Sequence, residues 1–394
     1  MGDYEIQKAS TGNISLYDGE HQEIMDLLTK QSFMYSGFGS SEYQYENILA
    51  SYDRFNRNVM LPVTDTPGLT FITRPRLNLS MPSLRRDNVM AMLDTIDTTS
   101  INFAVRMMLD TYLADSGVFK PLADQCPFID NNSPFLIPLS NTLMSQTGWP
   151  DPTLDTETIA EGFFCEDFTF VRGSDMLNRT YDLNLTFRDI QGSFISALLY
   201  YWLHYVELLP TGLTVAYQDD IFLRRMNYTC SIYRFILDPS RQYITKWAKA
   251  TGCMFKSHPI GQSFNHSEKQ AFLHENINLS VNFFCNKIEY MNPMIFQDFN
   301  RVTMKFSGDK TISDIQSYTK VPVSSNYNYI GFPYVDTYGL FNSKKVGMNE
   351  MVFLTDKSLD NPYKSKIESM FEDITVNSTL PSKSVEAMKE TMGV

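Results

Sequence analysis

The clearest pattern of apolar and polar positions lies between residues 181 and 290. Tyr181–Asp189 and Asn276–Phe284 both alternate apolar and polar residues, which is typical of a strand with one buried face. Between them, Ser193–Leu209 carries apolar residues at helical spacing. Its predicted buried face is made of Phe194, Ala197, Leu198, Tyr201, Trp202, Tyr205 and Leu209. The pattern therefore predicts a sheet with one helix packed on it.

The ends of this helix are also encoded. Ser193 is a suitable N-cap, and Pro210-Thr211-Gly212 predicts the end of the helix. Leu199, Leu203 and Val206 extend its apolar surface nearly all round. We therefore expect it to be buried on several sides.

Two further runs are predicted as strands, Ile221–Leu223 and Tyr228–Leu237. The second ends at Asp238-Pro239-Ser240-Arg241, which is a good turn sequence. These runs complete a mainly β core between the two alternating strands.

The first 80 residues are predicted to be mixed. Glu20–Lys30 is predicted as a helix and Ser36–Ser41 as a loop. Prolines 62, 67 and 75 exclude a helix over residues 61–80, and Leu69–Thr73 is predicted as a strand.

Residues 81–165 are predicted to hold two helices and an irregular segment. The helices are Ser83–Ile96 and Ser100–Ala114, and residues 120–155 are rich in proline. The breaker Trp149-Pro150-Asp151-Pro152 places a domain boundary between residues 150 and 165.

The last part of the chain is polar, with breakers at Pro322, Pro333 and Gly339. Lys364–Phe371 and Ser382–Thr391 are predicted as terminal helices. We therefore expect an N-terminal extension domain over residues 1–160, a core domain over 161–305 and a C-terminal extension over 306–394. The predicted fold class is α+β, mainly β.

The composition is that of a globular chain, with 43% hydrophobic and 20% charged residues. Aromatic residues reach 13%, which suggests a chain that buries much surface against neighbouring subunits. The formal net charge of −12 argues against a broad basic face for nucleic acid. An acidic surface would still suit a channel through which DNA passes without binding.

The five cysteines are widely spaced and form no C-x-x-C pair, which fits free thiols in a reducing cytoplasm. Three of them lie in strand-like runs, where buried free thiols are predicted. The N-terminal residues lack the pattern of a secretory signal. No apolar run reaches the roughly 18 residues that a membrane-spanning helix needs.

No P-loop, G-x-G-x-x-G, G-x-S-x-G or H-E-x-x-H motif occurs, so any chemistry would have to come from single residues outside such motifs. His258, His266 and His274 lie eight residues apart, near Cys253, whereas zinc ligands are usually paired more closely. Surface histidines are the preferred interpretation. His204, mid-helix among apolar neighbours, is predicted to be a hydrogen-bonded core histidine and not a base.

Two other candidates for chemistry are Asp219-Asp220 and Cys253. Adjacent carboxylates in an extended segment point to opposite faces, so a solvated turn is favoured over a cation site or a dyad. Cys253 lacks a basic activator nearby in sequence, so a nucleophilic role is not expected.

Surface recognition offers two more candidates. Tyr200, Tyr201, Trp202 and Tyr205 could stack on a sugar or base, but their helical spacing favours core or subunit contact. The basic residues are scattered and favour salt bridges between subunits over a phosphate track; they are Arg224, Arg225, Arg234, Lys246 and Lys249. No catalytic, cofactor-binding or metal-ligating residue is predicted, and the chain is not expected to be an enzyme.

Five pieces in order resemble the tail-tube fold of contractile bacteriophages. They are Leu183–Asp189, Tyr200–Leu203, Tyr217–Ile221, Ala250–Gly261 and Leu279–Phe284. The chain departs from the family at Lys256-Ser257-His258-Pro259, where a proline commonly follows the phenylalanine directly. More weakly, Thr70–Leu79 is similar to segments of large-phage virion proteins.

The resemblance implies a tail-tube-like β-sandwich or barrel core whose sheet edges join neighbouring subunits in a ring, typically of six. Such closure also protects open sheet edges from aggregation. The implied function is a structural component of a phage tail, forming a ring or tube that conducts DNA or joins the tube to baseplate or neck. The implied location is the virion tail, assembled in the host cytoplasm.

Two alternatives stay open. One is another virion component, such as a collar, wedge or sheath-associated protein. The other is a baseplate-associated cell-wall hydrolase, which would need a convergent acid pair or metal site. The implied partners are tube, sheath, baseplate or neck subunits, with passage of genomic DNA but no sequence-specific binding to it.

Overall fold

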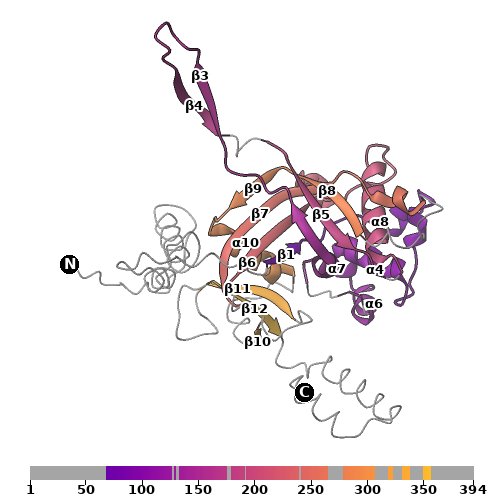
Figure 1. The fold of residues 1–394 in the computed structure, drawn as a ribbon. Coiled ribbons are helices and arrows are strands. Elements are labelled where there is room, and N and C mark those ends of the chain that lie inside the picture. The colour runs from indigo at the N-terminus through magenta and orange to yellow at the C-terminus, as the bar shows by residue number, and fades with distance from the viewer. Residues whose placement is uncertain are drawn as a thin grey trace, which may run out of the picture.

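The computed structural model describes residues 68–126, 128–129, 133–174, 179–190, 192–238, 241–264, 278–306, 318–322, 331–337 and 349–355. The helices predicted at Glu20–Lys30, Lys364–Phe371 and Ser382–Thr391, and the loop at Ser36–Ser41, lie outside these ranges. Figure 1 shows the described part as a curved sheet with helices on it and one hairpin projecting from it.

The helices and strands occur in groups along the chain. The strands are β1 (Gly68–Ile72), β2 (Leu143–Thr147), β3 (Leu154–Ile159), β4 (Phe168–Ser174), β5 (Tyr181–Arg188), β6 (Cys230–Leu237), β7 (Ile244–Phe255), β8 (Asn278–Cys285), β9 (Lys287–Tyr290), β10 (Thr319–Pro322), β11 (Phe332–Asp336) and β12 (Glu350–Thr355). The α-helices are α3 (Met81–Leu84), α4 (Ile101–Leu109), α5 (Thr111–Ala114), α6 (Lys120–Gln125), α7 (Ile137–Thr142), α8 (Phe194–Leu208), α9 (Gln218–Phe222) and α10 (Met294–Phe306), with 3-10 turns η1 (Met90–Leu93) and η3 (Pro259–Phe264).

The main sheet has the strand order β1-β6-β7-β8-β5-β2, with β9 also paired to β7, and its neighbouring strands are antiparallel. The predicted α+β, mainly β class is therefore confirmed. Within the described ranges the sheet is not closed into a barrel, but its two edges approach each other. The Thr70 hydroxyl in β1 donates to Gln146 Oε1 in β2 at 3.1 Å. The sheet thus curls so that its first and last strands are joined through side chains.

The two faces of β5 and β8 differ as their alternating sequence predicts. Leu183 pairs with Phe283, Leu185 with Val281 and Phe187 with Leu279, and all six side chains are buried. The residues between them point to the other side, where Asn184 pairs with Asn282 and Thr186 with Ser280. One face is therefore core and the other is polar, as expected from a period of two.

Helix α8 packs on the apolar face. Trp202 and Tyr205 are fully buried, and the Trp202 indole donates to the Tyr228 carbonyl at 3.0 Å. The predicted helix at 193–209 is confirmed, including burial on several sides. Ser193 precedes it as predicted but has φ 54° and forms no side-chain cap, so its role is to turn the chain.

A second core lies on the opposite side of β6 and β7. Tyr233, Phe235 and Trp247 pack there against Phe296 and Phe299 of α10. β11 and β12 also contribute to this core; they belong to a separate sheet of order β10-β12-β11, named here the small sheet. Because β6 is covered on both faces, it is nearly continuously apolar. By contrast, β5 and β8 keep their alternating pattern because their outer face is open.

The main sheet bends at Gly252 and Asn286. Up to Thr251, β7 pairs with β9, and beyond the bend Met254 and Phe255 pair with β8. Gly252 has φ 65°, and an added Cβ would lie 2.8 Å from Asn286 Nδ2. A glycine is needed here because the backbone is left-handed and the neighbour is close.

Two helices predicted near residues 83–114 are interrupted. The prediction of one helix at Ser83–Ile96 is wrong, since α3 ends at Leu84 and η1 begins at Met90. Asp87 Oδ2 accepts hydrogen bonds from the amides of Val89 and Met90, which starts a new turn. The predicted helix at Ser100–Ala114 is present as α4 and α5, divided where Asp110 caps Leu113.

Other predictions also need correction. Residues 120–155 are not irregular throughout, because Pro121 and Pro138 begin α6 and α7 and β2 follows. Ile221 and Phe222, predicted as a strand with Leu223, lie in α9. The strand β7 and the helix α10 were not predicted.

Strands from both sides of residue 160 share the main sheet. β1 pairs with β6 and β2 pairs with β5, although β1 and β2 precede the predicted core domain. The domain boundaries at residues 160 and 305 stay predictions. The main sheet itself also includes β1 and β2, which precede residue 160.

Candidate assembly surfaces

The most prominent surface is the β3–β4 hairpin, which projects away from the body of the molecule (Figure 1). Residues 151–173 are all exposed. Its tip is held by its own hydrogen bonds: the Phe164 amide donates to Glu166 Oε2 at 2.8 Å and the Gly162 amide to the Glu166 carbonyl at 2.9 Å. The hairpin therefore has a defined structure of its own, and neither of its faces packs on another part of the described chain.

Apolar side chains are concentrated on this hairpin. Phe163 and Phe164 at the tip are 94% and 85% exposed, and Phe168 in β4 is 65% exposed. Leu154, Ile159 and Val171 are exposed as well. Clustered exposed apolar residues of this kind indicate a contact surface for another protein.

A second exposed apolar surface lies at the end of α9. Residues 221–226, named here the α9 tip, are all exposed: Ile221, Phe222, Leu223, Arg224, Arg225 and Met226. Below it, Asp220 is buried and lies 3.5 Å from Arg76 Nε. This ion pair fastens α9 to the segment that follows β1.

The third surface is the open face of β2, β5 and β8. Its cross-strand pairs are amides and hydroxyls, such as Asn184 with Asn282. The charged residues at its ends include Arg188 and the ion pair between Asp182 and Lys256, at 2.6 Å. The face is therefore polar, with little net charge along its middle.

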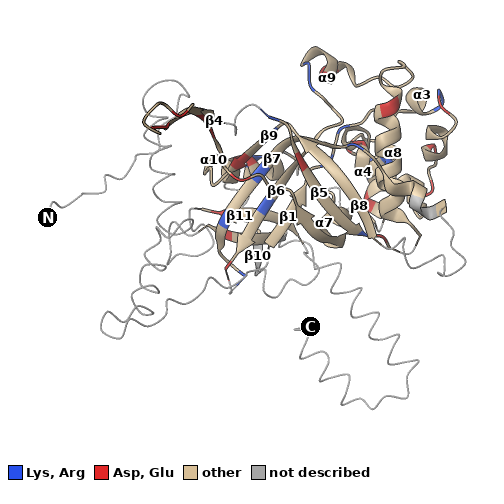
Figure 2. Ribbon diagram, turned by 45° about the horizontal axis from the view of Figure 1, so that its top comes forward, with Lys and Arg blue, Asp and Glu red and all other residues tan. Residues whose placement is uncertain are grey.

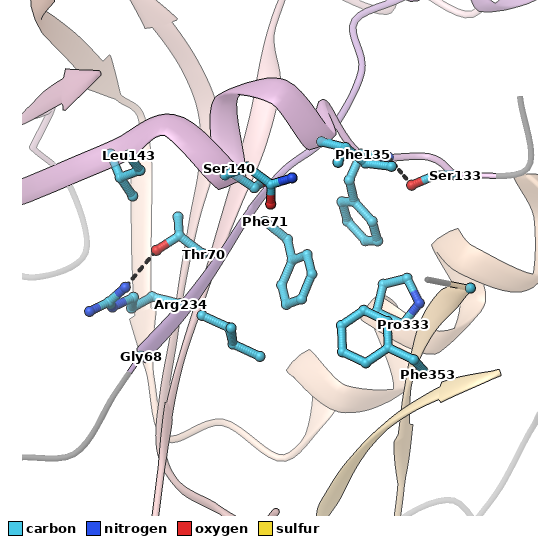
Figure 3. Close-up of a pocket in the computed structure, with 14 residues that line it drawn as sticks. Gly68, Thr70, Phe71, Ser133, Phe135, Ser140, Leu143, Arg234, Pro333 and Phe353 are labelled. Atoms are coloured by element: carbon cyan, nitrogen blue, oxygen red, sulfur yellow. Dashed lines mark hydrogen bonds between the residues drawn. The ribbon is translucent and has the colours of Figure 1, made fainter. Parts of the chain in front are cut away.

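A cavity of about 500 Å³ lies between β1, α7 and the small sheet (Figure 3). Phe71, Phe135 and Phe353 line one part of it. The guanidinium of Arg234 donates to the Thr70 hydroxyl at 2.7 Å, and burial lowers its pKa. This cation is already hydrogen-bonded, and the described residues that line the cavity include no Asp, Glu, His or Cys side chain.

The candidate histidines do not form one site in the described part of the chain. His204 is partly exposed on α8, with Nε2 3.0 Å from Asp87 and Nδ1 3.4 Å from Glu207, so it is paired as predicted but not in the core. His258 lies 3.2 Å from the Ser196 hydroxyl, and burial lowers its pKa. His266 and His274 lie outside the described residues.

The cysteines are all free, as predicted. Cys230, Cys253 and Cys285 lie on β6, β7 and β8 and are buried. A hydrogen bond with Cys285 and burial raise the pKa of Cys253, so this thiol is held in its protonated form. Cys165 at the hairpin tip is exposed.

The two aspartates do not form a solvated turn, so that prediction is wrong for Asp220. The helical backbone of α9 turns Asp220 inward, where it is 2% exposed, while the side chain of Asp219 is 70% exposed. The exposed apolar residues that follow, not the acids, are the unusual feature of this segment.

Several of the aromatic and basic candidates have partners within the chain. Tyr201, Trp202 and Tyr205 are core residues, which confirms the core interpretation for them. Lys249 pairs with Asp298 at 2.7 Å within the chain. Within the described residues no group of three or more His, Cys, Asp or Glu side chains is arranged to hold a metal ion. Nor does that part of the chain contain a helix suited to crossing a bilayer.

Comparison with known families identifies the chain. Residues 8–340 match the family described as "Putative phage tail tube protein", and the chain therefore belongs to that family. The resemblance seen in residues 183–284 is thereby confirmed. The match also extends across most of the segment predicted as an N-terminal extension.

Similar solved structures come from contractile injection systems. The cap of the anti-feeding prophage, an AFP tube terminating cap, is 10% identical, with 38% of this chain and 80% of that chain covered and a TM-score of 0.25. A chain of the sheath-tube complex of an extracellular contractile injection system, PVC, in the extended state is 10% identical, with 38% of this chain and 79% of that chain covered and a TM-score of 0.24. A chain of the PVC sheath/tube terminator in the extended state is 8% identical, with 38% of this chain and 84% of that chain covered and a TM-score of 0.23. At these TM-scores the likeness adds nothing to the family assignment, and the comparison with curated proteins found no match.

Proposed function

We propose that this chain is a structural subunit that assembles with copies of itself into a ring or tube of a phage tail. The observation that supports it is the β3–β4 hairpin, because residues 151–173 are exposed and carry apolar side chains. Removing apolar surface from water contributes roughly 25 cal/mol per Å² of apolar area, from which the entropy cost of association is subtracted. In an assembly of subunits, a neighbouring copy would cover the exposed apolar side chains of this hairpin.

The open face of β2, β5 and β8 suits the wall of a channel. Its central cross-strand pairs are amides and hydroxyls, such as Asn184 with Asn282. Phosphates bind tightly to clustered arginine and lysine, and this face has no such cluster along its middle. In our proposal this face lines the lumen, and DNA passes it without sequence-specific binding.

The ring is proposed to have six-fold symmetry and to join tube, sheath, baseplate or neck subunits in the virion. Assembly would take place in the host cytoplasm. In this proposal the chain acts as a structural component, needs no cofactor and is not an enzyme. Tube and terminal ring both follow from this proposal, and the position in an intact particle distinguishes them.

The test uses the purified full-length chain. Negative-stain microscopy and sedimentation velocity should detect rings or tubes, and class averages give their symmetry. A variant with residues 154–174 replaced by a short Gly-Ser linker should keep the wild-type circular dichroism spectrum and stay monomeric. A wild-type chain that remains monomeric at high concentration would overturn the proposal.

A further inference from the structure

The hairpin and the α9 tip have complementary properties. Both expose large apolar side chains, Phe163 and Phe164 on the first and Phe222 on the second, at 94%, 85% and 82%. Residues 154–174 contain five acidic residues and one basic residue, Arg172. The α9 tip instead carries two adjacent arginines.

The charges of the α9 tip are available for a partner. Arg224 and Arg225 are exposed and form no ion pair with any residue in the described ranges. The neighbouring acids do not neutralise them, because Asp219 and Asp220 face Arg76 at 3.9 and 3.5 Å. The tip is therefore apolar with a positive rim.

The hairpin has the opposite rim. Arg172 lies 3.7 Å from Glu157, so the one basic residue of the hairpin is already paired. Glu161 and Asp167 are exposed acids beside the apolar tip, and Asp155 is an exposed acid at the base of the hairpin. Two hairpins would repel each other, whereas a hairpin and an α9 tip attract.

One chain cannot bring these surfaces together. Figure 2 shows β4 on one side of the main sheet and α9 on the other. A second copy of the chain can supply the complementary partner of each surface. A contact between two different surfaces of identical chains is heterologous, and it repeats from copy to copy into a ring or a filament.

We propose that the β3–β4 hairpin of one copy docks on the α9 tip, residues 221–226, of the next copy. This inference rests on the proposed self-assembly and adds which two surfaces meet. Phe163 and Phe164 pack against the apolar residues of the tip, and Glu161 and Asp167 face Arg224 and Arg225.

Cysteine cross-linking tests the pairing, because Cys165 at the hairpin tip is the single exposed cysteine of this chain. In the full-length Met226→Cys variant, diamide removes two hydrogens from two facing thiols and leaves a disulfide. Each copy then carries one thiol on each surface, so a ladder of dimers, trimers and larger species is expected on a non-reducing gel. The matched control is Met92→Cys in η1, since Met92 and Met226 are both 62% exposed.

The outcomes separate the alternatives. A ladder with Met226→Cys that is absent with Met92→Cys, and lost when Cys165→Ser is added, supports the docking. Dimers that equal those of the wild type mean that two hairpins meet, and overturn it. A ladder that survives Cys165→Ser means that two α9 tips meet, and also overturns it.

Charge reversal gives a second, independent readout. Arg224→Glu with Arg225→Glu should weaken assembly at least about tenfold at low salt, and adding Glu161→Lys with Asp167→Lys should restore it. If wild type assembles in the microscope but neither the ladder nor the rescue appears, this docking is wrong and the proposed function stands. If wild type does not assemble, the proposed function itself fails.

Discussion

Trp202 of α8 and Phe255 of β7 meet edge to face, with ring centroids 5.2 Å apart and an interplanar angle of 89°. Phe255 in turn contacts Phe283 of β8 at 5.4 Å. This chain of rings joins the helix to two strands of the main sheet. The contact ties α8 to the place where the sheet bends, because Phe255 follows Gly252 in β7.

Trp202→Ala should lower the free energy of unfolding by about 3–5 kcal/mol, because it leaves a large cavity between α8 and the sheet. Urea unfolding followed by circular dichroism measures the change. Val118→Ala is the control: Val118 is 75% exposed and lies on neither proposed contact surface, so the change should stay within about 0.5 kcal/mol. Equal losses for both variants would contradict the placement of α8.

Gly252→Ala should destabilise the chain by about 1–3 kcal/mol, since φ is 65° and the new methyl meets Asn286 at 2.8 Å. Gly173→Ala in β4 provides the comparison, because its Cβ would have no heavy atom within 4 Å. Thermal unfolding of both variants distinguishes a strained bend from a general effect of adding a methyl group. A Gly252→Ala variant as stable as Gly173→Ala would argue against the bend.

Asp298→Asn should reveal a pH-dependent contribution to stability. Burial raises the pKa of Asp298, but hydrogen bonds from Lys249 and Tyr233 outweigh it, so the pKa lies below the ordinary 3.8. A lowered carboxyl pKa stabilises the fold above the unfolded value, and this stabilisation is lost as the pH falls through the folded value. The variant should therefore lose about 1–3 kcal/mol at pH 7 and progressively less below pH about 4.

Urea unfolding of wild type and Asp298→Asn between pH 7 and pH 3 measures this difference. Asp182→Asn is the control, because its ion pair with Lys256 is about half exposed, with side-chain exposures of 47% and 49%, and should contribute little. A constant difference between wild type and Asp298→Asn over the whole range would contradict the linkage.

Thiol labelling should count one accessible cysteine. Cys126, Cys230, Cys253 and Cys285 are buried and Cys165 is exposed. Burial also raises the pKa of Cys126 and Cys230, which further slows their reaction. Ellman's reagent should therefore modify one thiol quickly in the dilute folded chain and all five in denaturant; two fast thiols would contradict this arrangement.

The sequence predicted those elements whose apolar residues either alternate with polar ones or form a nearly continuous run. β5 and β8 alternate because one face is core and the other open, and α8 has apolar residues all round because it is buried on several sides. β6, which is covered on both faces, was predicted because its residues form a nearly continuous apolar run, whereas β7 was missed because Lys246 and Lys249 interrupt its apolar residues. The period of two is lost when both sides of a strand are covered.

The assembly surfaces were not predictable for a related reason. Ile221-Phe222-Leu223 has the composition of a buried strand, and only the structure shows these residues exposed on α9. An apolar residue that packs on a neighbouring subunit has the same sequence signature as one that packs in its own core. For this reason the α9 tip was predicted as a strand, and the beginning of the β3–β4 hairpin was predicted as part of an irregular segment.

The position of the β3–β4 hairpin in the chain has a consequence for how such a subunit can diversify. The hairpin leaves the sheet after β2 and returns at β5, and these two strands are hydrogen-bonded to each other. Its ends are held by the sheet, and lengthening a loop between fixed ends costs little free energy. Insertions or exchanges here would alter the spacing between copies without refolding the core, which makes the hairpin an interchangeable part.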